Sequence, residues 1–539
     1  MATYYMRADG SAANKAAATS DAAAATSMSR AVHNGETFSA GDTVVISDAG
    51  EEYGGGIIPP SSGTLGNKIN YTASGTPIAN GYQLITGWTA EGTANVWKAA
   101  YVNADPRFVS VDLSVGTRYA SDDLGSMDTN GDYAFDGVAD EVYLYDDTND
   151  PDTYSNPGIG GNYETTGLLI GSGISYVTID GLRCRFFHQS GFYAGEPGPG
   201  ITFSNCIGEY CYKGLTTGLN GGAAYTGTII EDCIGRYNEV HGINPGWSGT
   251  NVTVRRCSAH HNGWTYNSEF TAGIKSFDSS GVFSGYNCYE NECYSNGYDD
   301  GTAQQGDGAG IWLDATQGAT GTNKIHHNYI HDNVGVGIYL EICKNSIAYG
   351  NVVHDNATTN VVGQSAANIV VDTRLDFISS GNIVYNNTVF GGYRGIKVDA
   401  YTVGACELND NIVKNNICFG YSVCSIYCNN GGDNDAVHGS GNIYEKNCLG
   451  VEDTGFINWG GTGYDTYAAF KTAHGEAWDQ VAGDPSFTDS GGDDYTLAAG
   501  SPCIGEGINL GSPYDAALMP TTQAADWPDS VVTGSQDDY

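Results

Sequence analysis

A strand pattern that repeats along the chain is the feature that most constrains its fold. Between about residues 167 and 450, short strands that begin with Gly, Asn or Ser recur on average about every 29 residues. Their second positions hold one column of large apolar residues, namely Phe192, Leu215, Ile243, Ile274, Ile311, Ile338, Ile369, Ile396 and Ile426. Because stacked repeats bury such a column only when neighbouring units are in place, the pattern predicts a solenoid.

A second column identifies the kind of solenoid. One position that precedes the strand of each unit is filled by Cys in the early units and by Asn in the later units. In chain order these residues are Cys184, Cys206, Cys233, Cys257, Asn291, Asn328, Asn351, Asn387 and Asn416. A column that accepts either residue is typical of small buried groups and not of disulfide bridges. Short strands, Gly turns and this column predict an all-β fold, a right-handed parallel β-helix. The state of Cys418, Cys424 and Cys428, which cluster in sequence, stays open.

The pattern divides the chain into four parts. We expect an N-terminal strand and capping helix over 1–34, with the Ala-rich segment 12–32 as the helix. Residues 35–166 hold the first coils and an all-β insertion, and residues 167–450 form the core that carries an active groove. Residues 451–539 are expected to form a last coil, a short helix over 465–474 and a polar tail.

Four acids are aligned on the outward face of the repeat. The fifth strand position reads Asp314, Glu341, Asp372 and Asp399 in consecutive units. Stacked strands lie about 4.8 Å apart, and like charges at that spacing raise one another's pKa. Two carboxyls roughly 5 Å apart on an exposed surface are what a retaining glycoside hydrolase needs. We therefore predict Asp314, Glu341 and Asp372 as catalytic residues.

Residues beside the acids are predicted to bind substrate. The third strand position holds aromatic and basic side chains that could contact sugar rings. Three long loops, around 262–272, 296–309 and 356–367, flank the same coils, and long loops on a rigid scaffold commonly build sites. The predicted substrate-binding residues are Trp312, Tyr339, Lys275, Asp307, Asp399, Lys397 and Trp264.

Composition excludes several classes of partner. The formal net charge is −40 with only 22 Lys and Arg, which argues against nucleic acid and anionic membranes. No apolar run is long enough to span a bilayer, and the N-terminus lacks the regions of a signal peptide. We expect an extracellular or virion-associated monomer that needs no cofactor and acts on a neutral or weakly charged polysaccharide or oligosaccharide.

The repeat region resembles the pectate-lyase-like superfamily of right-handed parallel β-helix carbohydrate-active proteins. More narrowly, Gly310-Ile311-Trp312-Leu313-Asp314, followed one coil later by Leu340-Glu341, resembles the β-helix β-xylosidase-like glycoside hydrolases. This resemblance implies that Asp314 is the nucleophile and Glu341 the acid/base. The sequence departs from that family directly after both motifs, where Ala315 and Ile342-Cys343-Lys344 replace a bulky aromatic residue and a His-containing turn.

Two alternatives stay open at this point. In a Ca²⁺-dependent polysaccharide lyase or uronate epimerase, Asp314, Glu341 and Asp372 would bind the metal. The base would then be one of four cationic side chains, namely Lys275, Lys397, Arg394 or Arg374. In a non-catalytic viral adhesin, the same face would only hold glycans, and the chain would be expected to form a trimer.

Overall fold

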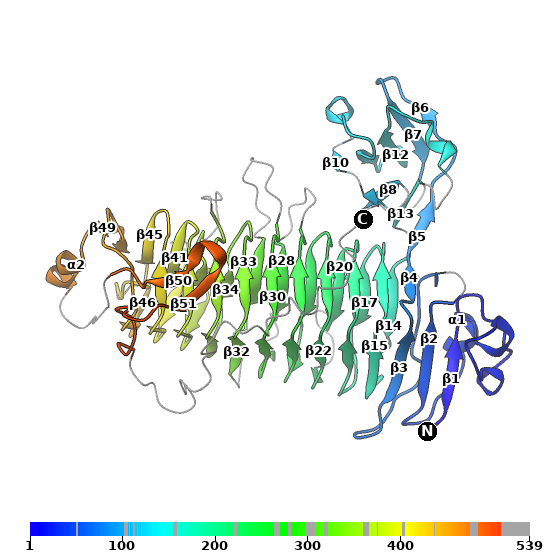
Figure 1. Ribbon diagram of the computed structural model, residues 1–539, viewed down its shortest axis with the longest axis horizontal. Coiled ribbons are helices and arrows are strands. Elements are labelled where there is room, and N and C mark those ends of the chain that lie inside the picture. Colours follow the sequence, from blue (N-terminus) through cyan, green and yellow to red (C-terminus); the bar gives the residue numbers. More distant parts are fainter. Residues whose placement is uncertain are drawn as a thin grey trace.

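The computed structural model describes most of the chain. The described residues are 1–49, 52–101, 106, 108–111, 114–115, 117–119, 121–154, 159–162, 164–218, 224–263, 270–278, 282–297, 308–316, 322–358, 366–374, 376–400, 405–435, 437–474 and 483–507. Three long sheets of stacked strands form an elongated solenoid (Figure 1). Their strands pair in parallel, except for the last pair, β48 and β49. The all-β parallel β-helix predicted from the sequence is confirmed.

The three sheets supply the three sides of each coil. Sheet A contains β1 (Thr3–Met6), β2 (Thr43–Ser47), β3 (Ile69–Ser74), β15 (Val177–Asp180), β18 (Thr202–Ser204), β22 (Ile229–Glu231), β26 (Thr253–Arg255), β29 (Asn287–Tyr289), β32 (Asn323–His326), β35 (Ser346–Tyr349), β39 (Ile383–Tyr385), β43 (Ile412–Lys414) and β47 (Ile443–Glu445). Sheet B contains β4 (Ile78–Asn80), β16 (Arg183–Arg185), β19 (Ile207–Glu209), β23 (Ile234–Arg236), β27 (Ser258–His260), β30 (Glu292–Tyr294), β33 (Tyr329–His331), β36 (Val352–His354), β40 (Thr388–Phe390) and β44 (Ile417–Phe419). Sheet C contains β14 (Thr166–Ile170), β17 (Ser190–Ala194), β20 (Lys213–Thr217), β24 (His241–Pro245), β28 (Ala272–Phe277), β31 (Ala309–Asp314), β34 (Ile338–Glu341), β37 (Ile369–Thr373), β41 (Arg394–Ala400), β45 (Cys424–Asn429), β48 (Ile457–Trp459) and β49 (Thr462–Tyr464).

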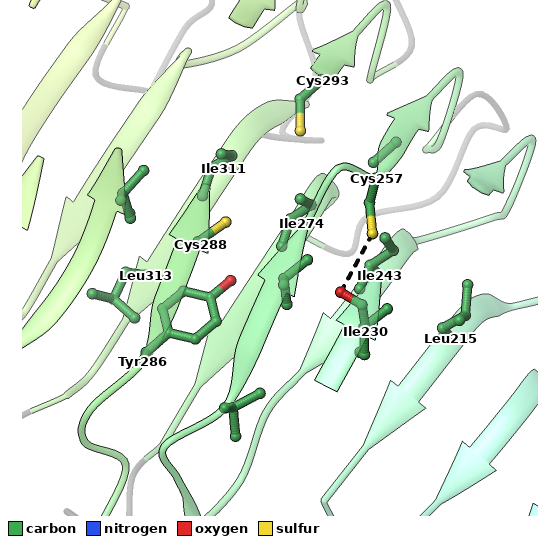
Figure 2. Packing of buried hydrophobic residues seen from close by; sticks show 14 of the residues in the cluster. Leu215, Ile230, Ile243, Cys257, Ile274, Tyr286, Cys288, Cys293, Ile311 and Leu313 are labelled. Atoms are coloured by element: carbon green, nitrogen blue, oxygen red, sulfur yellow. Dashed lines mark hydrogen bonds between the residues drawn. The ribbon is translucent and has the colours of Figure 1, made fainter. Parts of the chain in front are cut away.

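The apolar column of the repeat lies in the interior of sheet C. Leu215 pairs with Ile243, Ile243 with Ile274, and Ile274 with Ile311, so successive coils stack without a change of register. Figure 2 shows these side chains in line on successive strands, next to interior residues of the other two sheets. All nine column residues are buried. This register fixes which side chains of β31 and β34 point outward.

The Cys/Asn slot forms a ladder of buried side chains between sheets A and B. The backbone N–H of Cys257 donates to Oδ1 of Asn291 at 3.0 Å, and that of Asn291 donates to Oδ1 of Asn328 at 3.0 Å. The ladder continues through the later Asn residues as far as Asn447. Cys184 does not belong to this column, because it pairs with Gly208, two residues beyond the slot residue Cys206.

None of the cysteines in the described ranges forms a disulfide. The structure contains no disulfide among its fourteen cysteines, all of which lie in the described part of the chain. The cluster Cys418, Cys424 and Cys428 therefore consists of three unpaired, buried thiols.

The expected N-terminal capping helix is much shorter than the Ala-rich segment. Only α1 (Arg30–Asn34) is α-helical, and Lys15–Ala17 and Ala24–Thr26 form single 3₁₀ turns. Polar residues interrupt the segment: Asn14 accepts from the backbone of Ala17, and Ser20 accepts from that of Ala22. Such local bonds compete with helix propagation, and short helices are marginal by themselves.

The all-β insertion projects from the N-terminal part of the solenoid (Figure 1). Its two sheets are formed by β5 (Tyr82–Leu84), β6 (Thr89–Ala90), β7 (Val96–Ala100), β8 (Val109–Val111), β9 (Ser114–Val115), β10 (Arg118–Tyr119), β11 (Tyr133–Asp136), β12 (Glu141–Tyr145) and β13 (Ile159–Asn162). It encloses a small core of its own around Trp88, Tyr133 and Leu144.

Short elements complete the chain. Small sheets at the coil corners are formed by β21 (Tyr225–Thr226) with β25 (Gly249–Thr250), and by β38 (Ile378–Ser380), β42 (Glu407–Asn409) and β46 (Gly439–Ser440). After the last coils come α2 (Tyr467–His474) and an antiparallel pair, β50 (Phe487–Asp489) and β51 (Asp494–Leu497). This pair packs on sheet B, where the ring of Tyr495 lies 4.9 Å from that of His354. The tail predicted from Leu510 onward lies outside the described residues. None of the helices in the described ranges has the length and apolar character that crossing a membrane requires.

Candidate active site

The acids of the repeat stand in register on four neighbouring strands of sheet C. Asp314 at the end of β31 pairs with Glu341 at the end of β34, and Glu341 pairs with Asp372 of β37. Asp399 of β41 is the next partner in the row. Because strand neighbours lie about 4.8 Å apart, this register places the carboxyl groups next to one another along the solenoid axis.

The acids are buried, which the sequence did not indicate. Glu341 and Asp372 are 0% exposed and Asp314 only 7%, although all three point away from the solenoid interior. The expectation that the carboxyl pair lies on an exposed surface is therefore wrong. Side chains from neighbouring segments cover this face and remove the acids from bulk water.

Each carboxylate of the pair contacts a different cation. The Nζ of Lys275 on β28 lies 3.3 Å from Oδ2 of Asp314. Arg374, just after β37, forms an ion pair with Oε1 of Glu341. Neither oxygen of Glu341 accepts a well-aligned hydrogen bond. The partner of Asp314 is therefore an ammonium group, whereas the partner of Glu341 is a guanidinium group.

The pKa values of both acids are raised. Burial is the main cause for Glu341, the charges of Asp372 and Asp314 add to it, and Arg374 and Lys275 only partly oppose it, so the pKa lies well above its ordinary value. Burial also raises the pKa of Asp314, but Lys275 opposes this shift by charge and by hydrogen bonding. Of the two groups, Glu341 is the one that retains a proton to higher pH.

The aromatic residues beside the acids stack on each other. The rings of Trp312 and Tyr339 have centroids 5.1 Å apart with an interplanar angle of 22°, and Lys275 Nζ lies 3.1 Å from the centroid of the Trp312 ring. Both residues are almost fully buried, so an open stacking surface made of their faces, as expected from the sequence, is not present. The hydroxyl of Tyr339 donates to Oδ2 of Asp372 at 2.8 Å, and the indole Nε1 of Trp312 has no hydrogen-bond partner.

The remaining predicted residues fall into two groups. Asp399 and Lys397 form their own ion pair at 3.0 Å, and Asn430 donates to the other oxygen of Asp399. Trp264 and Asp307 lie outside the described residues.

Two residues of the site were missed or given another role by sequence reasoning. Phe270 is 43% exposed and packs its ring edge against Trp312 at 5.7 Å, with Arg374 5.3 Å above its face. Arg374 appeared only as an alternative base, whereas it is an ion-pair partner of Glu341. Its position two residues after Asp372 is the one signal in the sequence that could have placed it near the acids.

The donor set does not fit a calcium ion. The carboxylates of Asp314 and Glu341 face ammonium and guanidinium groups, and the Asp372 carboxylate accepts from a hydroxyl. Calcium requires six to eight oxygen ligands converging on one point. Across the ranges that the structure describes, no three His, Cys, Asp or Glu side chains converge in this way.

Comparisons with known proteins agree on the fold. Residues 246–375 match a family model described as a right handed beta helix region. A solved structure described as the complex of XylC with xylose aligns with a TM-score of 0.54 and 13% identity, over 90% of this chain and 87% of that chain. The A-module of the Azotobacter vinelandii mannuronan C-5 epimerase AlgE4 aligns with a TM-score of 0.37 and 15% identity, over 71% and 86%. Pectate lyase Pel9A aligns with a TM-score of 0.35 and 12% identity, over 95% and 88%. No curated protein sequence matches. The family model and the XylC alignment support the right-handed parallel β-helix fold.

Proposed function

On this right-handed parallel β-helix we propose a carbohydrate-active enzyme, a retaining glycoside hydrolase that cleaves a polysaccharide or oligosaccharide with Asp314 and Glu341. The observation that carries the proposal is the buried pair on adjacent strands, in which one carboxylate faces Lys275 and the other has a strongly raised pKa. When two neighbouring carboxyl groups have different pKa values, one can act as the nucleophile and the other as the acid.

In the first step, a carboxylate oxygen of Asp314 bonds to the anomeric carbon while the glycosidic bond breaks. The leaving oxygen takes the proton of Glu341, so the leaving sugar departs as a neutral alcohol. Lys275 favours the ionised form of Asp314, which is the form that attacks. The product is a glycosyl ester of Asp314 and an ionised Glu341, which Arg374 stabilises as its ion-pair partner.

In the second step, water attacks the anomeric carbon and gives its proton to Glu341. The ester bond breaks, Asp314 leaves as a carboxylate, and the configuration at the anomeric carbon is retained over the two displacements. The similar fold of XylC, whose structure is described with bound xylose, supports a sugar as the ligand of such a scaffold.

The test is hydrolysis of a broad polysaccharide panel by three variants. Asp314→Asn and Glu341→Gln should each lower the rate at which new reducing ends form by more than about a hundredfold, because a nucleophile or acid/base is missing. Asp180→Asn, which removes a surface carboxylate on sheet A, is the matched control and should keep the wild-type rate. All three variants should unfold within a few degrees of the wild-type temperature. Residual rates above a hundredth of wild type in both site variants would rule out the pair.

Two other product patterns would identify the competing functions. Products with an ultraviolet-absorbing unsaturated uronate, formed without hydrolysis and lost with a chelator, would indicate a lyase. Glycan binding without any new reducing ends, together with a stable trimer in light scattering, would indicate an adhesin.

A further inference from the structure

A second group of polar side chains lies on sheet C on the N-terminal side of the acids. We call it the Lys213 cluster; it consists of Lys213 on β20, His241 and Asn244 on β24, and Lys275 on β28. Lys213 stands opposite His241 in the strand register and donates from Nζ to Oδ1 of Asn244 at 3.2 Å. Asn244 in turn donates from Nδ2 to the backbone carbonyl of Lys275 at 2.6 Å. Since Lys275 also contacts Asp314, the cluster is continuous with the catalytic pair.

His241 is the unusual member of the cluster. The residue is only 5% exposed, and its buried Nδ1 has no hydrogen-bond partner among the residues that the structure describes. Burial and the charges of Lys213 and Lys275 hold its pKa well below the ordinary value, so the ring is neutral. A buried polar atom without a partner destabilises the folded state, and native structures contain few of them. A bound group that hydrogen-bonds to this ring would remove the cost.

We propose that the Lys213 cluster binds an anionic oxygen group, a carboxylate or a sulfate, carried by the glycan that is cleaved at Asp314 and Glu341. This inference rests on the proposed function. Ammonium groups and a neutral imidazole N–H are donors suited to such an oxygen, and charge-assisted bonds of this kind are about twice as strong as neutral ones.

The position of the cluster places the anionic group beside the cleaved bond and not at it. His241 and Asp314 lie two strand steps apart, or about 10 Å along the solenoid axis. The chain as a whole has a net charge of −40 and only 22 Lys and Arg. Its field opposes a dense polyanion, so the cluster suits a glycan with acidic substituents spaced along an otherwise neutral chain.

Binding to the inactive Asp314→Asn variant tests the inference without requiring turnover. Acidic polysaccharides are each compared with their carboxyl-reduced form, and sulfated polysaccharides with their desulfated form, by affinity electrophoresis and titration calorimetry. We expect at least one acidic member to bind about tenfold or more tightly than its neutral form, since a hydrogen bond to a charged group is stronger than one between neutral groups. The two pairings show whether the group is a carboxylate or a sulfate.

Four further substitutions on that background separate a local site from general charge effects. Lys213→Met and His241→Phe should abolish the preference, whereas Lys213→Arg, which keeps the charge, should retain most of it. Lys324→Met removes the same charge from β32 on sheet A and should leave the preference intact. Thermal unfolding identifies any variant that fails to fold. If His241→Phe fails to fold, the comparison of Lys213→Met with Lys213→Arg still tests the inference.

Equal affinity for acidic and neutral forms across the panel would overturn the inference, as would a preference that survives Lys213→Met or is lost in Lys324→Met. Failure of the proposed function would be seen separately, as a wild-type chain that binds these glycans but forms no new reducing ends.

Discussion

At the scale of residues, the site depends on the neighbouring charges that give two similar carboxyl groups different pKa values. Asp314 has Lys275 at 3.3 Å, which stabilises its ionised form. Glu341 is buried, and the charges of the two acids beside it add to the effect of burial, so its neutral form is favoured despite Arg374. The charge of Asp372 is one of the causes of the raised pKa of Glu341. We therefore assign Asp372 the role of setting this pKa, with Tyr339 holding its side chain in place.

The pH–rate profile tests this assignment. Glu341 must be protonated to act as the acid, so the rate should fall as pH rises through its raised pKa. Asp372→Asn removes a negative charge beside Glu341, which lowers that pKa and moves the alkaline limb of the profile to lower pH. Asp399→Asn, whose carboxylate is already paired with Lys397, is the control and should leave the limb in place. An alkaline limb that stays fixed or moves to higher pH in Asp372→Asn would contradict the assignment.

At the scale of elements, each strand of sheet C both supports the stack and presents the site. Alternation along β31 and β34 buries Ile311, Leu313, Ile338 and Leu340 in the solenoid, and the same alternation sends the acids to the other face. The Asn ladder fixes the height of each coil, because every rung joins the backbone N–H of one coil to the side chain of the next. Loss of one rung would therefore disturb two coils.

Asn328→Ala tests the ladder. The substitution leaves the buried N–H of Asn291 without its acceptor, and it also removes the bonds that Asn328 Nδ2 makes to Cys288 and Asn351. The free energy of unfolding should fall by about 2–4 kcal/mol, as unsatisfied buried groups cost about 1–3 kcal/mol each. Urea unfolding followed by circular dichroism measures the change.

Asn287→Ala is the matched control, because Asn287 lies on the outside of β29, where its side chain bonds His326. This change should cost about 1 kcal/mol or less. Equal losses in the two variants would show that the ladder has no special part in stability.

At the scale of the whole molecule, stability comes from stacking and not from covalent links. The main hydrophobic cluster extends through the described coils from the first strands to α2, and many of the cysteines belong to it as small apolar groups. No disulfide joins any two of the fourteen cysteines, all of which lie in the part of the chain that the structure describes.

Reductant should therefore leave the protein unchanged. The melting temperature with and without excess thiol reductant should agree within about 1 °C, because no disulfide contributes to folding. Thiol titration of protein denatured without reductant should find all fourteen cysteines, and titration of the native protein should find far fewer. Fewer than fourteen thiols in the denatured sample would reveal a disulfide.

The repeat pattern was sufficient to predict the solenoid, its register and the alignment of the acids. A period of about 29 residues with one apolar position per strand leaves a single way to stack the coils, and Asp314 then stands beside Glu341. The register of Lys275, Trp312 and Tyr339 on successive strands follows from the same column.

The surroundings of those residues are visible only in the folded chain. That the acids are buried, that Arg374 pairs with Glu341 and that Phe270 covers Trp312 depends on segments that leave the repeat between strands. Such segments have no periodic pattern, so the sequence does not show where their side chains return to the sheet. The Ala-rich N-terminal segment does not form the predicted long helix, and the reason is related. Its helix propensity is a weak local preference, and side-chain caps and packing against the first strands outweigh it.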